Sequence, residues 1–216
     1  MSQRRGMANF VAGGIYGITD DALSRGRSSV EVVRLLLAAG VRVIQYREKA
    51  KPARVMYEEC LAIRGLTADT GATFIVNDHV DLAMAVGADG VHVGQDDLPP
   101  VKVRELVGSD MAIGLSTHSP EQAREADKLA GVIDYIGVGP VYATDTKKDA
   151  SAPVGLALLE YAAANVNLPY VAIGGIKQSN IAEVSRRGPG MIAIVSDIVG
   201  ADDIVAKVAA LRAAMA

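Results

Sequence analysis

The stretch from Phe74 to Asp97, FIVNDHVDLAMAVGADGVHVGQDD, decides the fold. Its two ends, FIV and GVHV, are short apolar runs typical of buried strands, bounded by turn residues. Between them, Val80, Leu82, Ala83 and Val86 recur with the spacing of one helix face. The stretch therefore predicts a strand, a helix and a second strand. In such a unit the two strands are parallel and their carboxyl ends lie side by side.

A carboxylate follows each of these two strands. Asp78 comes after the first and Asp97 after the second, so the unit predicts that both side chains meet at one edge of the sheet. Two hard oxygen ligands at that edge are suited to one Mg²⁺ ion. The alternative is that each Asp caps the N-terminus of the helix that follows it.

The alternation of strand and helix recurs eight times along the chain. The expected strands are Ile15–Ile18, Val41–Tyr46, Thr73–Val76, Gly90–Val93, Ala112–Leu115, Tyr135–Val138, Tyr170–Ile173 and Met191–Val195. The expected helices are Ser29–Ala39, Ala53–Thr70, Asp81–Val86, Pro100–Val107, Pro120–Ala130, Leu156–Ala164, Ser179–Arg187 and Asp202–Ala214. Eight such units in 216 residues indicate a single α/β domain, a closed (β/α)8 TIM barrel, over residues 13–216. A doubly wound open sheet is the second choice, and residues 1–12 are expected to be a poorly ordered leader.

Composition sets further bounds on function. Hydrophobic residues make up 50% and charged residues 22%, which is typical of a soluble globular domain. The net charge of −3 provides no field that would attract nucleic acid or an anionic membrane. Cys60 is the only cysteine, which excludes an internal disulfide and fits the cytoplasm. The apolar patch near the N-terminus is too short to span a bilayer.

In a barrel of this kind, functional residues follow the strands at the carboxyl end. Gln45, Arg47 and Lys49 alternate along the second strand and just beyond it, so all three point to the same face. A guanidinium and an ammonium at the mouth need an anion, and a phosphate or pyrophosphate supplies it. The alternative is a salt bridge to a neighbouring acid such as Asp78.

A second anion site is expected after the last two strands. Gly174 and Gly175 follow strand seven, and Val195 and Ser196 follow strand eight, where many barrels bind a phosphomonoester through backbone N–H groups. Simple turn geometry is the alternative reason for the glycine pair. Asp197 would repel the phosphate and is expected to face away from it.

The connection after the sixth strand, from Gly139 to Gly155, is longer than most such loops. Thr144, Asp145, Thr146 and Lys147 lie in it and could close over an anionic ligand, although a solvated surface loop is the alternative. Two anion sites and a metal at one mouth predict that a phosphorylated substrate meets a pyrophosphorylated one.

The three histidines give a weaker signal. His79 begins a helix, His118 follows the fifth strand, and His92 lies within the fourth strand, where it faces either the interior or the helices. None pairs with another at a metal-ligand spacing, so no zinc site is predicted.

Five blocks of the sequence resemble the thiamine-phosphate synthase family, also called thiamine-phosphate pyrophosphorylase. They are QYREK (45–49), NDHVDLAMAVGADGVHVGQDD (77–97), GLSTHS (114–119), GPVYATDTKKD (139–149) and AIGGI (172–176). The resemblance implies a transferase that joins 4-amino-2-methyl-5-(diphosphooxymethyl)pyrimidine to a thiazole phosphate. The products are thiamine phosphate and pyrophosphate, with CO₂ as well when the thiazole carries a carboxylate.

The resemblance also implies a role for individual residues. Asp78 and Asp97 match the Mg²⁺ ligands, with Asp96 as a neighbouring alternative to Asp97. The pyrimidine diphosphate site corresponds to Gln45, Tyr46, Arg47, Glu48, Lys49, Asn77, Ser116 and Lys147. The thiazole phosphate site corresponds to Thr144, Asp145, Thr146, Gly175, Val195 and Ser196.

In the mechanism that the family implies, pyrophosphate leaves first and the thiazole nitrogen attacks the resulting pyrimidine cation. Arg47, Lys49, Ser116 and Lys147 are the expected catalytic residues, because such a path needs stabilised charge and positioning more than a protein base. A related tautomerase that lacks the coupling step and a non-catalytic binder are the alternative functions. A homodimer is expected from the family alone.

Overall fold

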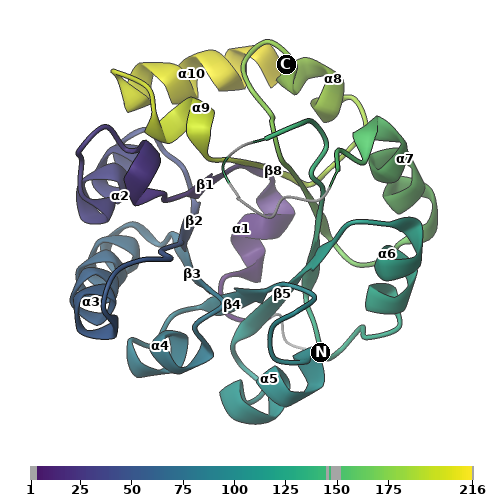
Figure 1. Ribbon diagram of the computed structural model, residues 1–216, viewed down its shortest axis with the longest axis horizontal. Coiled ribbons are helices and arrows are strands. Elements are labelled where there is room, and N and C mark those ends of the chain that lie inside the picture. Colours follow the sequence, from purple (N-terminus) through teal and green to yellow (C-terminus); the bar gives the residue numbers. More distant parts are fainter. Residues whose placement is uncertain (1–3, 145, 147–151, 216) are drawn as a thin grey trace.

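The fold is a closed barrel of eight parallel strands surrounded by helices (Figure 1). The computed structural model describes residues 4–144, 146 and 152–215. The strands are β1 Gly14–Ile18, β2 Val43–Tyr46, β3 Thr73–Asn77, β4 Gly90–Val93, β5 Ala112–Thr117, β6 Tyr135–Val138, β7 Tyr170–Ile173 and β8 Met191–Ile194. Each strand pairs with its neighbours in sequence, and β8 closes the ring on β1. The expected TIM barrel is confirmed, and the open sheet is excluded.

Helices follow the strands and form the outer layer. They are α2 Ser29–Ala38, α3 Ala53–Thr70, α4 Val80–Ala85, α5 Pro100–Val107, α6 Pro120–Asp127, α7 Gly155–Asn165, α8 Ile181–Ser185 and α10 Ile204–Met215. Two short helices at the carboxyl end of the barrel were not expected, η1 Asp21–Leu23 after β1 and α9 Ser196–Val199 after β8. Among the described residues, no helix has the length and apolar character needed to cross a membrane.

The first described residues differ from the expected leader. Met7–Ala12 form helix α1, and Met7 and Phe10 in it are buried. The Asn9 side chain donates to the Gly71 carbonyl and to Thr73, which ties α1 to the start of β3. Because α1 directly precedes β1, it covers the amino-terminal end of the barrel, and Figure 1 shows it at the centre of the ring. The expectation of disorder was wrong for α1. The apolar residues of this short segment become ordered because they pack on the end of the barrel, a surface that the sequence alone does not show.

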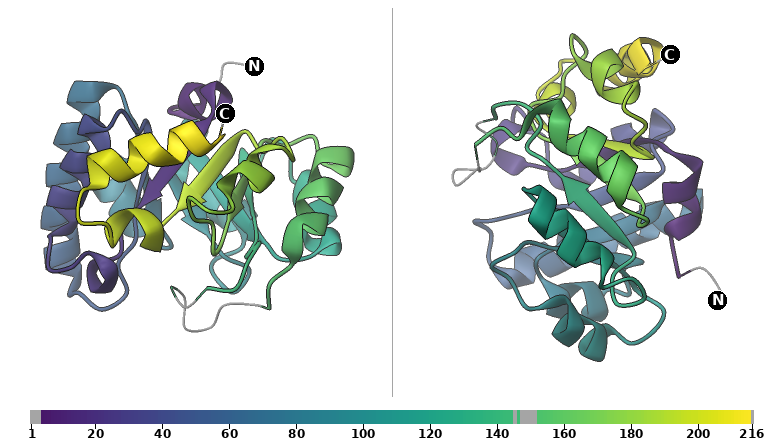
Figure 2. Two further views of the ribbon diagram at one scale, coloured as in Figure 1. Left: turned by 90° about the horizontal axis from the view of Figure 1, so that it is seen from above. Right: turned by 90° about the vertical axis from the view of Figure 1, so that its right-hand side faces the viewer.

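The strands separate two hydrophobic cores. The larger one lies between the sheet and the helices, and the smaller one fills the barrel interior. The inner core holds Phe10 from α1, Tyr16 from β1 and Tyr135 from β6. Figure 2 shows α1 at the opposite end of the barrel from the segment that leaves β6. The inner core is therefore closed below by α1 and open above to the strand ends.

Two carboxylates, one buried and one partly buried, are fixed at the amino-terminal end of the strands. Asp89 accepts hydrogen bonds from the backbone N–H of Phe74 at 2.9 Å and from Arg64 at 2.9 Å. In the same way, Asp134 accepts from the N–H of Ile113 at 2.8 Å and from Arg104 at 3.0 Å. Arg4, which precedes α1, also pairs with Asp134. Each carboxylate thus joins the start of one strand to a surrounding arginine.

Ser119, which precedes Pro120, and Ser179 are residues whose types and positions predict helix N-caps. Ser119 caps α6 as expected, since its hydroxyl accepts from the N–H of Gln122 at 3.2 Å. Ser179 does not cap α8, because the N-cap of that helix is Asn180. The Asn180 side chain instead accepts from the N–H of Lys177 at 2.7 Å and closes a turn before the helix. The turn includes Ser179 and Asn180, which were expected to begin the helix.

Candidate active site

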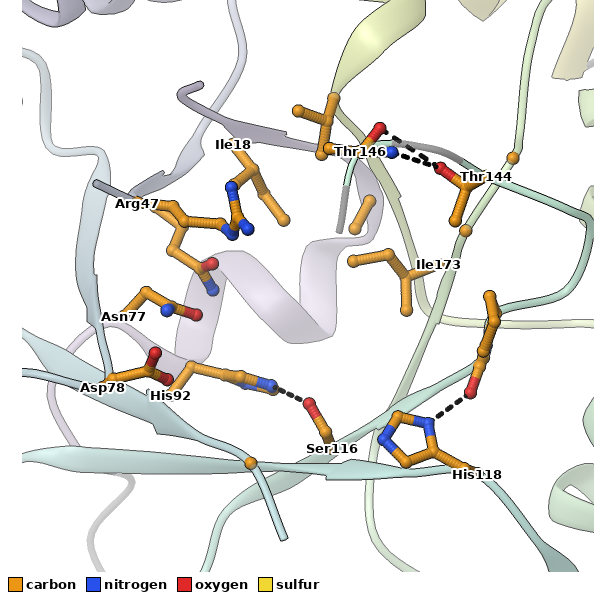
Figure 3. A pocket seen from close by; sticks show the side chains of 18 of the residues that line it. Ile18, Arg47, Asn77, Asp78, His92, Ser116, His118, Thr144, Thr146 and Ile173 are labelled. Carbon is orange, nitrogen blue, oxygen red and sulfur yellow. Dashed lines mark hydrogen bonds between the residues drawn. The ribbon is translucent and has the colours of Figure 1, made fainter. Parts of the chain in front are cut away.

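One pocket of about 460 Å³ opens at the carboxyl ends of the strands (Figure 3). It brings together most of the residues that the sequence predicted for the site, from both ends of the chain. Those that line it are Gln45, Arg47, Lys49, Asn77, Asp78, Asp96, Asp97, Ser116, Thr144, Thr146, Gly175, Val195 and Ser196. Asp145 and Lys147 lie outside the described residues.

Strand β2 and the residues after it supply the cationic side of the pocket. Gln45, Arg47 and Lys49 all line it, as their alternation predicts. Figure 3 shows the Arg47 side chain reaching into the cavity, with Asn77 and Asp78 beside it. The side chains from β2 and β3 therefore place positive charge and amide groups on one wall.

Tyr46 and Glu48 are not among the residues that line this pocket, and their assignment to the pyrimidine site stays a prediction. They alternate with Gln45, Arg47 and Lys49 and so point toward the helix layer. The Tyr46 hydroxyl donates to Glu59 of α3 at 2.6 Å, and burial together with Glu59 raises the pKa of that phenol. Glu48 is buried and accepts from the backbone N–H groups of Lys49 and Ala50 at 2.7 and 2.8 Å. Glu48 shapes the turn that carries Lys49.

Both cations of this wall are paired with carboxylates. Arg47 binds Asp20 at 2.7 Å, and Lys49 binds Asp78. The predicted alternative of a salt bridge to Asp78 is therefore present for Lys49. Sequence reasoning missed Asp20, although its place just after the first strand was a signal that could have found it. Each cation is held at the pocket by a carboxylate, and an anionic ligand can compete with that carboxylate for the cation.

The two proposed metal ligands have distinct local structures. Asp78 lies directly after β3 with a positive φ of 60°, a conformation that Asp tolerates better than most residues. Asp97 accepts from the backbone N–H of Gly94 at 2.7 Å and so closes the loop after β4. Neither caps a helix, because His79 and Pro99 are the N-caps of α4 and α5. The N-cap alternative is therefore excluded for both.

The carboxylates are compatible with Mg²⁺. Among the hydrogen bonds of the described residues, the side chains of Asp78 and Asp97 each use only Oδ2. The described part of the chain contains no group of three or more His, Cys, Asp or Glu side chains that could hold a metal. Mg²⁺ is commonly bound by one or two carboxylates, with water and substrate phosphates completing its coordination. A pair of carboxylates in one pocket, without a further His or Cys ligand among the described residues, fits that ion better than zinc.

The floor of the pocket contains groups that sequence reasoning left unassigned. His92 faces the interior, and its Nε2 lies 2.9 Å from the hydroxyl oxygen of Ser116. Tyr135 lies below, with its hydroxyl 3.1 Å from Nδ1 of His92. His118 also lines the pocket, and its Nδ1 is 2.6 Å from the carbonyl oxygen of Gly139. Ser116 is therefore held from beneath by a histidine.

The opposite wall comes from β6, β7 and β8. Thr144 and Thr146 line it and are hydrogen-bonded to each other at 3.1 Å. Gly174 and Gly175 have positive φ values of 100° and 62°. A Cβ atom on Gly174 would lie 2.4 Å from Pro140. The glycines therefore serve the close approach of the segment after β6, in addition to lining the pocket.

Asp197 faces away from the pocket, as expected. Its carboxylate accepts from the backbone N–H of Gln178 at 3.0 Å and lies 3.6 Å from the Lys207 ammonium. The wall beside Ser196 is therefore free of this negative charge.

Comparison with known proteins agrees with this geometry. Residues 15–198 match a family described as thiamine monophosphate synthase. The chain belongs to this family. A thiamine-phosphate synthase from Pelotomaculum thermopropionicum is 62% identical over 213 residues, which cover 99% of this chain and 97% of that protein. One from Lawsonia intracellularis is 53% identical over 93% of this chain and 92% of the relative.

A solved structure supports the same assignment. The thiamine phosphate pyrophosphorylase from Pyrococcus furiosus superposes with a TM-score of 0.86 at 38% identity, covering 96% of each chain. The chain is thus a transferase of thiamine biosynthesis in the thiamine monophosphate synthase family, and it acts on small molecules.

Proposed function

We propose that the chain couples 4-amino-2-methyl-5-(diphosphooxymethyl)pyrimidine to a thiazole phosphate and releases thiamine phosphate and pyrophosphate. The observation that carries this proposal is the division of one pocket into two walls. Arg47, Lys49 and Asp78 line one wall, and Thr144 and Ser196 line the other. The first set suits a diphosphate with its metal, and the second suits a phosphomonoester.

The pyrimidine diphosphate would bind on the β2 and β3 wall. Arg47 can bind a diphosphate oxygen pair in a bidentate manner, while Lys49 contributes a single mobile charge. Asn77 and Gln45 offer amide groups beside them for the heterocycle. Binding would replace the Lys49 contact with Asp78 by a contact with phosphate, so that Lys49 stabilises the departing pyrophosphate. Lys147 is proposed to assist from the loop after β6, outside the described residues.

Asp78 and Asp97 are the proposed ligands of one Mg²⁺, with Asp96 at the same rim as the alternative to Asp97. When bound, this ion would neutralise charge that develops on the pyrophosphate as its bond to carbon breaks. The two carboxylates would hold the ion near the wall where the diphosphate would bind.

Loss of pyrophosphate leaves a cation on the pyrimidine methylene carbon, and the thiazole nitrogen then forms the new C–N bond. The task of the second wall is to hold the thiazole so that its nitrogen faces that carbon. Thr144, Thr146, Gly175 and Ser196 would hold its phosphate, with Val195 beside the ring and Asp145 in the same loop. This path needs no strong base from the protein, which agrees with a site that is rich in charge and hydrogen-bond donors.

The deciding experiment is thiamine phosphate formation from the two precursors with and without Mg²⁺, with pyrophosphate measured in the same reaction. Equal amounts of both products, formed only with the metal, would support the proposal. Isomerisation of the thiazole carboxylate without coupling would instead identify a tautomerase, and binding without turnover would identify a binder. Running the assay with each form of the thiazole shows whether CO₂ is also released.

We also propose a cytoplasmic location, supported by the presence of a single cysteine, and a homodimer, which is supported by family resemblance alone. Cys60 is buried, and burial followed by the charge of Glu59 raises its pKa to about 12. Its thiol is therefore a core group without a role in the reaction.

A further inference from the structure

Hydrogen bonds connect two walls of the pocket through the barrel interior. The Gln45 amide donates to the Tyr16 hydroxyl at 2.8 Å, and that hydroxyl lies 3.2 Å from the hydroxyl of Tyr135. The Tyr135 hydroxyl is 3.1 Å from Nδ1 of His92, whose Nε2 is 2.9 Å from the Ser116 oxygen. The two end residues of this hydrogen-bond chain, Gln45 and Ser116, line the pocket, and Figure 3 shows the bond between His92 and Ser116. Tyr16 and Tyr135 themselves are buried below it.

The strand register explains how His92 and Tyr135 meet. His92 on β4 pairs with Gly114 on β5, which in turn pairs with Tyr135 on β6. A Cβ atom on Gly114 would lie 2.2 Å from Tyr135 and 2.4 Å from Nδ1 of His92. Glycine at this position therefore leaves the space in which the two side chains form their hydrogen bond. From below, the Phe10 ring packs on Tyr135 at 4.4 Å between centroids.

The amide of Gln45, at one end of the hydrogen-bond chain, decides which group donates and which accepts at each bond. An amide nitrogen only donates, so the Tyr16 oxygen is the acceptor from Gln45. The Tyr16 proton is then directed to Tyr135, and the Tyr135 proton to Nδ1 of His92. Burial raises the pKa of both phenols, so each keeps the proton that this order requires. Nδ1 of His92 is then the acceptor, which leaves Nε2 as the ring nitrogen that donates to the Ser116 oxygen.

We infer that Tyr135, supported by Tyr16, is a positioning residue that makes Ser116 a hydrogen-bond donor toward the substrate. Because the Ser116 oxygen accepts from His92, its own hydrogen is directed into the pocket. There it would meet an acceptor atom of the pyrimidine diphosphate, which is where this inference rests on the proposed function. Gln45 at the other end would set the direction of the chain from the opposite wall.

Packing alone does not account for the two hydroxyl groups. Phenylalanine would fill the same space as tyrosine in an interior that already contains Phe10. A buried hydroxyl group destabilises the fold unless it is hydrogen-bonded. Here the Tyr16 hydroxyl is hydrogen-bonded to Tyr135, and the Tyr135 hydroxyl to His92. The arrangement is therefore better explained by what it does to His92 and Ser116.

The first test is the tautomer of His92 in the substrate-free protein, read by long-range ¹H–¹⁵N NMR with ¹⁵N-labelled histidine. We expect an unprotonated Nδ1 and a protonated Nε2 in the wild type. In Tyr135→Phe the ring would lose this constraint and populate both tautomers. Tyr170→Phe is the matched control. It also removes a tyrosine hydroxyl, but one that donates to the carbonyl of Arg187 at 2.8 Å and takes no part in the hydrogen-bond chain from Gln45 to Ser116. It should leave the His92 signals unchanged.

The second test is a double-mutant cycle in the coupling assay. Tyr135→Phe is expected to lower kcat/KM for the pyrimidine diphosphate roughly tenfold, the size of one lost hydrogen bond. If Tyr135 acts through Ser116, adding Tyr135→Phe to Ser116→Ala should reduce kcat/KM no further than Ser116→Ala alone. Independent effects that multiply would overturn the inference.

The two tests separate this inference from the proposed function. A protonated Nδ1 on His92 in the wild type would refute the assigned direction, whatever the activity, and this measurement does not require the variant to fold. Absence of coupling by the wild type would overturn the proposed function and the role of Ser116 toward this substrate. The His92 tautomer would still show whether the hydrogen bonds from Gln45 to Ser116 have the assigned direction.

Discussion

The two ends of the barrel hold carboxylates in different ways. At the amino-terminal end, Asp89 and Asp134 each bind an arginine and the backbone N–H that begins a strand. At the carboxyl end, Asp78 binds the ammonium of Lys49, whose side chain is 53% exposed. Asp97 is exposed and binds a backbone N–H of its own loop.

This difference separates stability from function. The partners of Asp89 and Asp134 are part of the framework, so exchanging them for a ligand would disrupt the start of a strand. The exposed ammonium that pairs with Asp78 can instead be exchanged for another cation or move to an anion. Charge at the lower end should therefore matter for unfolding, and charge at the upper end for turnover.

The largest expected effect is that of Asp78→Ala at the upper end. We expect kcat/KM for coupling to fall on the order of 100- to 1,000-fold, because a charged group at the reacting centre is lost. The thermal midpoint should stay close to that of the wild type. Asp81→Ala is the control, since Asp81 is exposed in the first turn of α4. Full coupling activity in Asp78→Ala would disprove the metal site.

Lys147→Ala tests the loop after β6. Loss of a positioned cation should cost about 2 to 4 kcal/mol of transition-state stabilisation, measured from kcat/KM. Lys102→Ala is a suitable control, because Lys102 pairs with Glu105 on the outside of α5. Unchanged kcat and KM in Lys147→Ala would remove this residue from the proposed site.

Asp134→Asn tests the lower end, and its expected effect is on folding. The amide can still accept from the N–H of Ile113 but leaves Arg4 and Arg104 without their charged partner, at a cost of about 2 kcal/mol in the free energy of unfolding. Chemical denaturation measures this loss, and kcat should not change. Asp110→Asn, at an exposed position nearby, is the control. A fall in kcat with wild-type stability would contradict the division between the two ends.

The smallest effect is expected outside both ends. Arg54 and Glu58 form an ion pair on α3, and their side chains are 89% and 62% exposed. Arg54→Ala should therefore change the free energy of unfolding by less than about 0.5 kcal/mol and leave coupling unchanged. A larger change in the same denaturation experiment would show that surface charge matters more than this comparison assumes.

Much of the fold could be predicted from the sequence because each strand is a short apolar run bounded by polar or glycine residues. Alternation after β2 also placed Arg47 and Lys49 on the pocket side, whereas Tyr46 and Glu48, which the family motif adds, lie on the alternate positions and do not line the pocket. Helix α1 could not be predicted from its own residues, since six residues form a stable helix only when another surface covers their apolar side.

The interior hydrogen-bond chain was also beyond sequence reasoning. Tyr16 and Tyr135 are separated by 119 positions, and either could have been an ordinary core residue. Their contact depends on strand register and on the space above Gly114, neither of which a single sequence specifies. Asp20 was missed for a simpler reason, since the residues after the first strand were not considered.

Helix α1 has a consequence for the electrostatics of the pocket. Its Phe10 ring lies against Tyr16 and Tyr135 and keeps bulk water from entering the barrel at the end far from the substrate. Only Met7 and Phe10 of the six residues in α1 are buried, and segments with few buried apolar contacts are among those that open most readily in a folded protein. Each opening would hydrate the tyrosines from below and raise the local dielectric constant beneath the reacting groups. Loss of this packing, at the end of the barrel remote from the pocket, would thus weaken the interaction of the pocket charges with the substrate.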